Sequence, residues 1–358
     1  MAEKKRVVVL GATGGTASHI ALNLAESGYE VVAAGRRKSD NGFFADYGIQ
    51  YISVDISKPA DFDKLPNDNV YAVVHYAGIQ PAFIDHENRQ KYIDIIVSGT
   101  LNVLEYVRKV GAERIVFPQS LYDVHYLFGS RTPIPADSPK QIPEGDHAIY
   151  VIAKNMACDL IEWYHSLYGI KRYIFRMSRI YLYNPDPYFY EDGKRFMYSD
   201  RFMIYKAMKG EDIEMWGDPD RLLETMCVKD LEQLIRLALC TDSEGGLYNV
   251  GSGGTTLRER LQGIIDEFSP ENQKSKLIPR PDKPNGTQFI LDYSKASKEL
   301  GYKPEYTWRK YLQYFKTEMR LQRFEKLRGR ESDYVDMSSL PDLAEIGLVA
   351  ARMAKDKS

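Results

Sequence analysis

Short apolar runs alternate with amphipathic stretches along the first half of the chain, a pattern typical of a sheet covered by helices on both faces. Val- and Ile-rich runs predict strands at Arg6–Leu10, Glu30–Ala34, Gln50–Val54, Val70–His75, Ile115–Gln119 and Tyr173–Met177. Helical periodicity is clearest over Gly99–Val110 and Ala148–Leu167. Strands that alternate with helices predict the α/β class and a doubly wound parallel sheet, with ligands at the carboxyl edge of its strands.

The composition of the chain changes after Tyr181, where Tyr, Phe, Pro and charged residues replace the regular alternation of apolar and amphipathic stretches. We therefore expect a dinucleotide-binding domain over 1–181, with a return segment at about 225–250. A smaller C-terminal α/β substrate lobe is expected from 182–224 and 251–320. Residues 321–358 form a charged, weakly amphipathic appendage, for which a helix, a partner contact and partial disorder all stay open.

The first predicted strand runs directly into a glycine-rich turn, Gly11-Ala12-Thr13-Gly14-Gly15-Thr16-Ala17, and then into a helix that ends near Gly28. This order places backbone N–H groups and a helix N-terminus in front of an anion. Gly11 allows the tight turn, and Gly14 lets a pyrophosphate approach the backbone. The pattern predicts dinucleotide binding by Gly11, Thr13, Gly14, Gly15 and Thr16; the alternative is a βα turn that binds nothing.

Two arginines replace the acid that commonly follows the second strand and binds the ribose 2′-hydroxyl. The sequence there is Ala34-Gly35-Arg36-Arg37-Lys38. Because paired arginines can hold a 2′-phosphate, Arg36 and Arg37 favour NADP(H) over NAD(H); the alternative is a solvated basic loop. Asp55-Ile56 after the third strand and Ala77-Gly78 after the fourth are further candidates for cofactor contact.

Tyr150 and Lys154 lie one helical turn apart, which places a phenol and an ammonium on one helix face. A neighbouring ammonium, together with the positive nicotinamide of an oxidised cofactor, lowers the pKa of a phenol, so that Tyr150 could exchange a proton with a substrate near neutral pH. Because the spacing Tyr-x-x-x-Lys occurs four times, only its context selects this copy. It opens the helix that follows the predicted fifth strand, and Ser120 ends that strand, where a hydroxyl can bond the reacting oxygen.

Amino-acid composition limits the classes of binding partner and the cellular compartment that we expect. The chain has 48 basic and 50 acidic residues among 358, and this balance argues against a nucleic-acid or membrane surface. Three cysteines, Cys158, Cys227 and Cys240, lack metal-ligand spacing and favour a reducing, cytoplasmic setting. No metal site is predicted, and the apolar run behind Lys4-Lys5-Arg6 is too short for a signal peptide or a membrane span.

These motifs together resemble the extended short-chain dehydrogenase/reductases, the NAD(P)-dependent epimerase/dehydratase family. The similarity covers about Val7 to Tyr314 and is carried by residues 11–17, Phe117-Pro-Gln-Ser120, Tyr150-x-x-x-Lys154, Phe175-Arg176, Tyr248-Asn-Val-Gly251 and Asp292-Tyr-Ser-Lys295. It implies a Rossmann lobe, a Ser-Tyr-Lys active site and a homodimer formed by the helices at about 99–110 and 148–167. Many members act on nucleotide sugars.

Four departures from the family pattern bear on the substrate. Leu121-Tyr122 follow Ser120 where dehydratases have an Asp-Glu pair, so we rank dehydration low and keep Asp123 as a residual acid. Leu223 stands where an Arg often holds the nucleotide diphosphate, and Arg221 is the candidate substitute. Ile96 replaces an Asn of the proton relay. His75 is either a second acid/base group or a partly buried histidine whose hydrogen bonds are made within the protein.

The sequence thus predicts an NADP(H)-dependent oxidoreductase or epimerase that uses Ser120, Tyr150 and Lys154 on a small, sugar-like substrate. A nucleotide-sugar epimerase or 4-ketoreductase is favoured. A reductase of a non-nucleotide carbonyl compound is the alternative. A non-catalytic NADP-sensing or nucleic-acid-binding relative is the alternative from another class. The aromatic residues between 181 and 202 either stack on the substrate or form the core of the smaller lobe.

Overall fold

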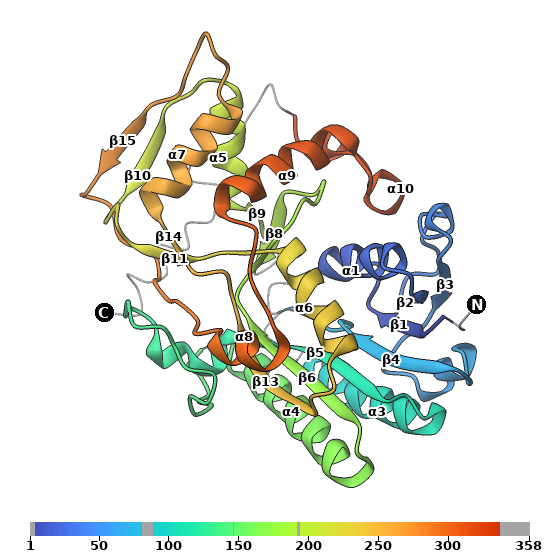
Figure 1. Ribbon diagram of the computed structural model, residues 1–358. Coiled ribbons are helices and arrows are strands. Elements are labelled where there is room, and N and C mark those ends of the chain that lie inside the picture. Colours follow the sequence, from blue (N-terminus) through green and yellow to red (C-terminus); the bar gives the residue numbers. More distant parts are fainter. Residues whose placement is uncertain (1–3, 81–88, 146, 192–193, 337–358) are drawn as a thin grey trace.

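A computed structural model describes residues 4–80, 89–145, 147–191 and 194–336 (Figure 1). Its main sheet has seven parallel strands in the order β13-β6-β5-β4-β1-β2-β3. The strands are β1 (Arg6–Leu10), β2 (Glu30–Gly35), β3 (Gln50–Ser53), β4 (Val70–His75), β5 (Arg114–Ser120), β6 (Lys171–Met177) and β13 (Gly245–Val250). The predicted fold class, a Rossmann doubly wound parallel sheet, is confirmed.

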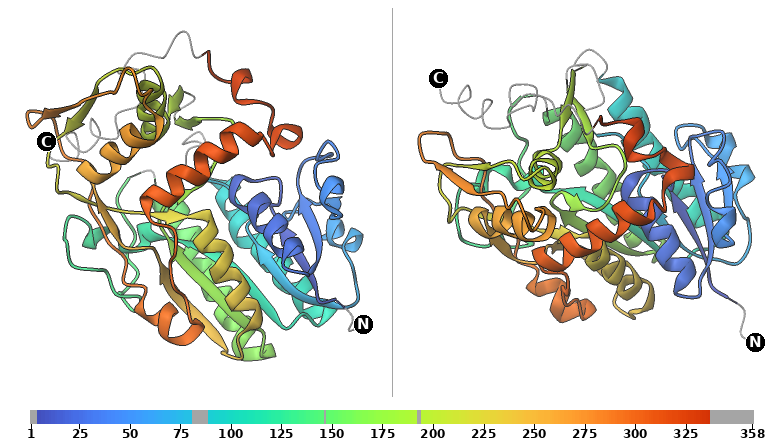
Figure 2. Two further views of the ribbon diagram at one scale, coloured as in Figure 1. Left: turned by 45° about the horizontal axis from the view of Figure 1, so that its top comes forward. Right: turned by 90° about the horizontal axis from the view of Figure 1, so that it is seen from above.

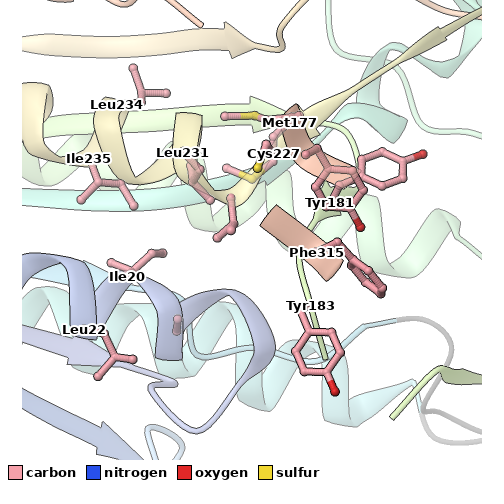
Figure 3. Close-up of a cluster of buried hydrophobic side chains, with 14 of the residues drawn as sticks. Ile20, Leu22, Met177, Tyr181, Tyr183, Cys227, Leu231, Leu234, Ile235 and Phe315 are labelled. Atoms are coloured by element: carbon pink, nitrogen blue, oxygen red, sulfur yellow. The ribbon is translucent and has the colours of Figure 1, made fainter. Parts of the chain in front are cut away.

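Helices cover both faces of this sheet because its strands are apolar on both sides. Val7 and Val9 of β1 face one core, while Val8 and Leu10 face the other. The first core lies beneath α1 (Gly15–Glu26) and α6 (Val228–Cys240), and the second beneath α3 (Gly99–Val110) and α4 (Ala148–Tyr168). Figure 3 shows Ile20 of α1 and Leu231 of α6 in the first core.

The smaller lobe packs beyond the carboxyl ends of β5 and β6 (Figure 2). Its helices are α5 (Ser199–Met208), α7 (Leu257–Phe268) and α9 (Trp308–Leu321), and α8 (Ser294–Leu300) lies on β13. Its short strands pair as β7 (Ile180–Tyr181) with β12 (Met226–Cys227), β8 (Tyr188–Glu191) with β9 (Lys194–Met197), β10 (Ile213–Trp216) with β15 (Leu277–Arg280), and β11 (Leu222–Glu224) with β14 (Gly254–Thr256).

Part of the aromatic stretch between 181 and 202 belongs to the core. Tyr181, Tyr183 and Phe202 are buried, and Tyr183 meets Phe315 of α9 edge-on with ring centroids 5.3 Å apart (Figure 3). Arg179 stacks over Tyr198 at 4.1 Å. For the three buried rings, the structure favours packing over substrate stacking.

A C-terminal arm, residues 322–335, follows α9 and joins the two lobes. It contains α10 (Glu325–Arg328) and a 3-10 turn at Glu331–Asp333. The carboxylate of Glu331 forms a 2.5 Å ion pair with buried Arg201 of α5 and accepts a hydrogen bond from Tyr205. Part of the predicted appendage is therefore ordered, while residues 337–358 lie outside the described residues.

Within the described part of the chain, none of the helices combines the length and apolar character needed to traverse a bilayer.

Candidate active site

The glycine turn lies at the carboxyl end of β1, against the end of β4. Gly11 has φ +79°, and a Cβ placed on it would lie 2.6 Å from the backbone nitrogen of Ala77, so only glycine fits there. Gly14 caps α1 with no side-chain hydrogen bond, and the first turn holds no acidic residue. The N–H groups at the start of α1 are thus left for an anion, and this donor set fits the pyrophosphate of a dinucleotide.

The basic residues after β2 lie at the same edge. Arg36 and Arg37 are both exposed. Arg37 Nη1 donates to the Leu327 carbonyl of the C-terminal arm at 2.7 Å, and Arg328 Nη2 of that arm donates to the Thr13 carbonyl at 2.8 Å. Sequence reasoning missed Arg328, because no local pattern links it to a loop 315 residues earlier.

The other predicted cofactor residues differ in exposure. The Asp55 carboxylate is half-buried and accepts hydrogen bonds from the backbone and the hydroxyl of Ser57. Ile56 is buried, and its side chain packs so closely on Gly99 of α3 that a Cβ there would lie 2.8 Å away. Gly78 is exposed beyond the end of β4. The Ile56 side chain is therefore part of the core, and its backbone carbonyl accepts a hydrogen bond from the Asn102 side chain at 2.9 Å.

The structure brings Ser120, Tyr150 and Lys154 together at the carboxyl end of β5. Ser120 is the last residue of β5, and Tyr150 and Lys154 lie on the first turns of α4. Lys154 Nζ donates to the Pro118 carbonyl at 2.7 Å and lies 6.0 Å from the centroid of the Tyr150 ring. Tyr92 meets the Tyr150 ring edge-on at 6.3 Å.

The protonation of this trio differs from the expectation. Burial raises the pKa of Tyr150, and hydrogen bonding with the Ser120 hydroxyl only partly offsets the rise. Burial also lowers the pKa of Lys154 to about 8. The expected lowering of the Tyr150 pKa by Lys154 is not found: the ammonium donates to the Pro118 carbonyl and lies 6.0 Å from the centroid of the phenol ring.

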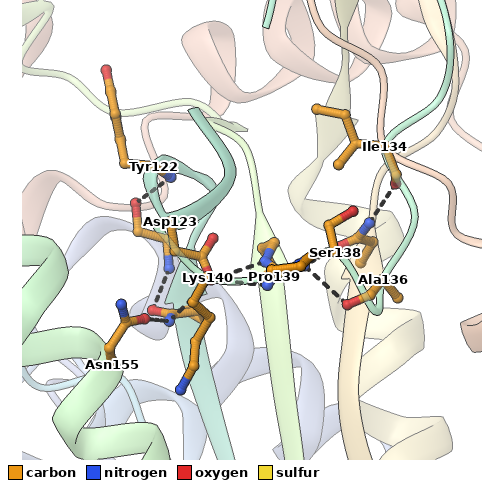
Figure 4. A network of polar contacts seen from close by, with 12 residues as sticks. Tyr122, Asp123, Ile134, Ala136, Ser138, Pro139, Lys140 and Asn155 are labelled. Carbon is orange, nitrogen blue, oxygen red and sulfur yellow. Dashed lines mark hydrogen bonds and ion pairs between the residues drawn. The ribbon is translucent and has the colours of Figure 1, made fainter. Parts of the chain in front are cut away.

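A polar network surrounds the end of β5, and Figure 4 shows Asp123 and Asn155 within it. The side-chain oxygen of Gln119 accepts from the Ser120 backbone N–H at 2.8 Å, and its nitrogen donates to Asn155 of α4 at 2.8 Å. Asp123 forms a 2.9 Å ion pair with Arg176 of β6, and their side chains are 0% and 1% exposed. A carboxylate sealed in this way cannot reach a substrate, so the residual assignment of Asp123 as an elimination acid is not supported.

His75 is a buried core residue. Its Nε2 lies 3.1 Å from the Thr100 hydroxyl, and its ring packs against Phe117. Burial, followed by the charge of Lys154, lowers the pKa of His75 to about 3, so the ring is neutral at physiological pH. This favours the structural interpretation of His75 over a second acid/base group.

Arg221 lies in the smaller lobe beside the loop that contains Gly286. A Cβ on Gly286 would lie 2.0 Å from Arg221 Nη1, and the Arg221 Nε has no hydrogen-bond partner among the described residues. Burial and the charge of Arg260 lower its pKa. Among the described residues, Arg221 forms no hydrogen bond with the Ser-Tyr-Lys trio, and no group of His, Cys, Asp and Glu side chains could hold a metal ion.

A parallel sheet with a glycine turn after its first strand, and a Ser-Tyr-Lys set at its carboxyl edge, defines a Rossmann protein of the dinucleotide-binding class. The chain belongs to the NAD dependent epimerase/dehydratase family, whose model matches residues 7–251. The family resemblance, and with it the enzyme class, is thereby confirmed.

Known relatives agree with this assignment. A putative UDP-glucose 4-epimerase of Methanocaldococcus jannaschii is 27% identical over 299 residues, which are 84% of this chain and 93% of that protein. UDP-glucose 4-epimerase from Thermotoga maritima, solved with UDP-glucose, has a TM-score of 0.67 at 20% identity and covers 88% of this chain and 99% of its own. dTDP-glucose 4,6-dehydratase from Bacillus anthracis, solved with NAD, has a TM-score of 0.66 at 18% identity and covers 90% and 99%.

Proposed function

We propose that the protein is an NADP(H)-dependent nucleotide-sugar epimerase or 4-ketoreductase that works through Ser120, Tyr150 and Lys154. The observation that carries this proposal is the meeting of the three side chains at the sheet edge that also holds the glycine turn. Family membership favours this catalytic hypothesis over a non-catalytic, NADP-sensing or nucleic-acid-binding relative.

The chemistry assigns one role to each side chain. The bound nicotinamide would supply or accept a hydride at the substrate carbon. The Tyr150 hydroxyl gives a proton to the substrate oxygen or takes one from it, and the Ser120 hydroxyl hydrogen-bonds the same oxygen. The Lys154 ammonium binds the nicotinamide ribose. In an epimerase the proton moves from the substrate hydroxyl to Tyr150 and back, whereas a ketoreductase needs only the return step.

The pKa values of the free protein fit a site that is adjusted by its cofactor. Tyr150 is half-buried and its pKa is raised, so the phenol is protonated in the free protein. A positive nicotinamide next to Tyr150 would favour the phenolate, which the oxidative direction needs. Because an ordinary tyrosine is also protonated at neutral pH, net reduction is favoured instead by Arg36 and Arg37, which suggest an exchangeable NADPH.

Arg221 supports a nucleotide diphosphate as the recognition element. It is a partly buried arginine in the substrate lobe, and no carboxylate pairs with it among the described residues. Relatives that act on UDP-glucose and dTDP-glucose suggest pyrimidine nucleotides. The alternative, a non-nucleotide carbonyl substrate, rests on Leu223 at the position where the family often has its diphosphate-binding Arg.

Tyr150→Phe tests the mechanism. Hydride transfer should fall by at least about a hundredfold, because the phenyl ring cannot exchange a proton. Cofactor affinity, measured by fluorescence titration, should stay within about twofold of wild type. Retained turnover would reject the role of Tyr150.

A thermal-shift screen with UDP- and dTDP-sugars tests the substrate class. We expect stabilisation by at least one nucleotide sugar and its loss in Arg221→Ala. If no nucleotide sugar raises the Tm of the cofactor-loaded enzyme, the non-nucleotide alternative replaces this proposal.

Exposed apolar residues on α3 and α4 support the proposed homodimer. Trp163 and Leu167 are 53% and 55% exposed, and Met156, Tyr168 and Leu101 lie on the same two helices. Burial of such a surface in a second copy removes apolar area from water. The dimer predicts twice the chain mass in light scattering, and Trp163→Glu should yield monomers. For the compartment we propose the cytoplasm, since all three cysteines are free thiols.

A further inference from the structure

The C-terminal arm packs on the part of the main sheet that carries the glycine turn (Figure 1). Phe324 is buried against His19 of α1 at 4.2 Å and against Phe43 at 5.6 Å, both between ring centroids. The Asn41 side chain donates to the Lys326 carbonyl at 3.0 Å. The arm is thus fixed beside the loop that follows β2, and Arg328 has a defined position there.

Arg328 and Arg37 come together at this place from opposite ends of the chain. Arg328 donates to the Thr13 carbonyl of the glycine turn at 2.8 Å, and Arg37 donates to the Leu327 carbonyl at 2.7 Å. Burial and the neighbouring charge of Arg37 lower the pKa of Arg328 to about 10. The two guanidinium groups therefore repel each other, and holding them together costs free energy.

No carboxylate in the described ranges forms an ion pair with either arginine. Asp186 attracts Arg328 from beyond ion-pair distance, and its own carboxylate accepts the Tyr188 backbone N–H at 3.0 Å. Both arginines donate here only to neutral carbonyl groups. A doubly charged anion that replaced those acceptors would remove the repulsion and gain charge-assisted hydrogen bonds.

We propose that Arg328 of the C-terminal arm, together with Arg37, binds the 2′-phosphate of the adenosine ribose in NADP(H). This inference rests on the proposed use of NADP(H). The ribose is the part of a dinucleotide expected at the end of β2, where Arg37 lies, while the start of α1 serves the pyrophosphate. Arg328 is then a specificity-determining residue from a segment outside the family match at 7–251.

The test is a fluorescence titration of the full-length protein with NADPH and NADH. Arg328→Met should weaken NADPH binding by roughly ten- to a hundredfold, as expected for lost charge-assisted bonds, and NADH binding by less than about threefold. Arg328→Lys keeps the charge and should recover part of the loss. Arg330→Met is the matched control, because Arg330 is an exposed arginine of the same arm that pairs with Glu325.

The outcomes separate this inference from the proposed function. If the wild type binds NADH as tightly as NADPH, the proposed cofactor is wrong. If the wild type prefers NADPH and Arg328→Met leaves that preference unchanged, the role of Arg328 is wrong. An equal loss for both cofactors would assign Arg328 to the pyrophosphate and overturn the 2′-phosphate assignment.

A second measurement needs no variant and keeps the proposal testable if Arg328→Met does not fold. In the wild type, NADPH should slow backbone hydrogen exchange within residues 322–335 more than NADH does at equal saturation. Equal protection by the two cofactors would contradict a 2′-phosphate contact from the arm.

Discussion

Replacing Asp123 by Asn removes the charge of a carboxylate that is sealed inside the protein. Asp123 Oδ2 accepts two bonds from Arg176, at 3.1 Å from Nε and 2.9 Å from Nη2. The remaining partners of Arg176 are the neutral oxygens of Ala136 and Asn249. In Asp123→Asn the guanidinium stays buried with no anion beside it.

Breaking a buried ion pair from one side costs about 3–5 kcal/mol, a large part of a stability of roughly 5–15 kcal/mol. We expect a fall in Tm of roughly 5–15 °C, measured by circular dichroism or calorimetry. Asp159→Asn is the matched control: Asp159 pairs with Lys140 at 2.6 Å, but the two side chains are 68% and 37% exposed. Loss of such a surface pair costs less than about 1 kcal/mol.

The double variant Asp123→Leu/Arg176→Met distinguishes charge burial from loss of packing. It should recover most of the lost stability, because no unpaired charge remains inside. If Asp123→Asn is as stable as Asp159→Asn, the ion pair does not support the end of β5, and our reasoning fails. If it abolishes a dehydration reaction without lowering Tm, Asp123 is catalytic after all.

Three further predictions concern pH and backbone geometry. The pKa of Lys154 is about 8, so its ammonium loses a proton and cofactor affinity should fall as pH rises through 8. In Lys154→Gln the cofactor affinity should depend less on pH. His75 has a pKa of about 3 in the folded protein and is neutral there, but in the unfolded chain it takes up a proton below about pH 6.5. The free energy of unfolding, measured in urea, should therefore be about 2 kcal/mol lower at pH 5 than at pH 7. In His75→Gln this fall in stability between pH 7 and pH 5 should be smaller. Gly245→Ala should cost more than 3 kcal/mol of stability by roughly adding a steric clash to the strain of a positive φ, because its Cβ would lie 1.9 Å from the Arg172 carbonyl. Gly301 has a similar positive φ but lies in open space, so Gly301→Ala should cost only about 1 kcal/mol. Chemical denaturation measures both.

The sequence predicted the sheet well where hydrophobic periodicity is local. The strand Arg6–Leu10 and the helix Gly99–Val110 have the predicted bounds, and α4 ends one residue later than expected. The strand β13 was not among the predicted strands, because it begins with Gly245-Gly246, which lack the side chains that signal a strand. Its pairing with β6 is decided by contacts distant in sequence.

The candidate site was predictable only to the extent that strand order determines it. Ser120 ends β5 and Tyr150 lies at the start of α4, the next helix along the chain, so the carboxyl edge of the sheet could place them together. The direction of the Lys154 ammonium, the sealing of Asp123 by Arg176 and the approach of Arg328 to Thr13 depend on tertiary packing. No local pattern of residues encodes those three contacts.

The C-terminal arm makes the order of synthesis matter. Thr13 leaves the ribosome early, but Arg328 follows 315 residues later, and Glu331, which neutralises buried Arg201, comes later still. A nascent chain stopped after α9 would already contain all residues matched by the family model. In that chain, however, Arg201 would lack the counter-charge of Glu331, and the glycine turn would lack its contact with Arg328. A nonsense mutation between residues 322 and 331 should therefore yield a polypeptide that protein quality control degrades, although every family motif in it is intact.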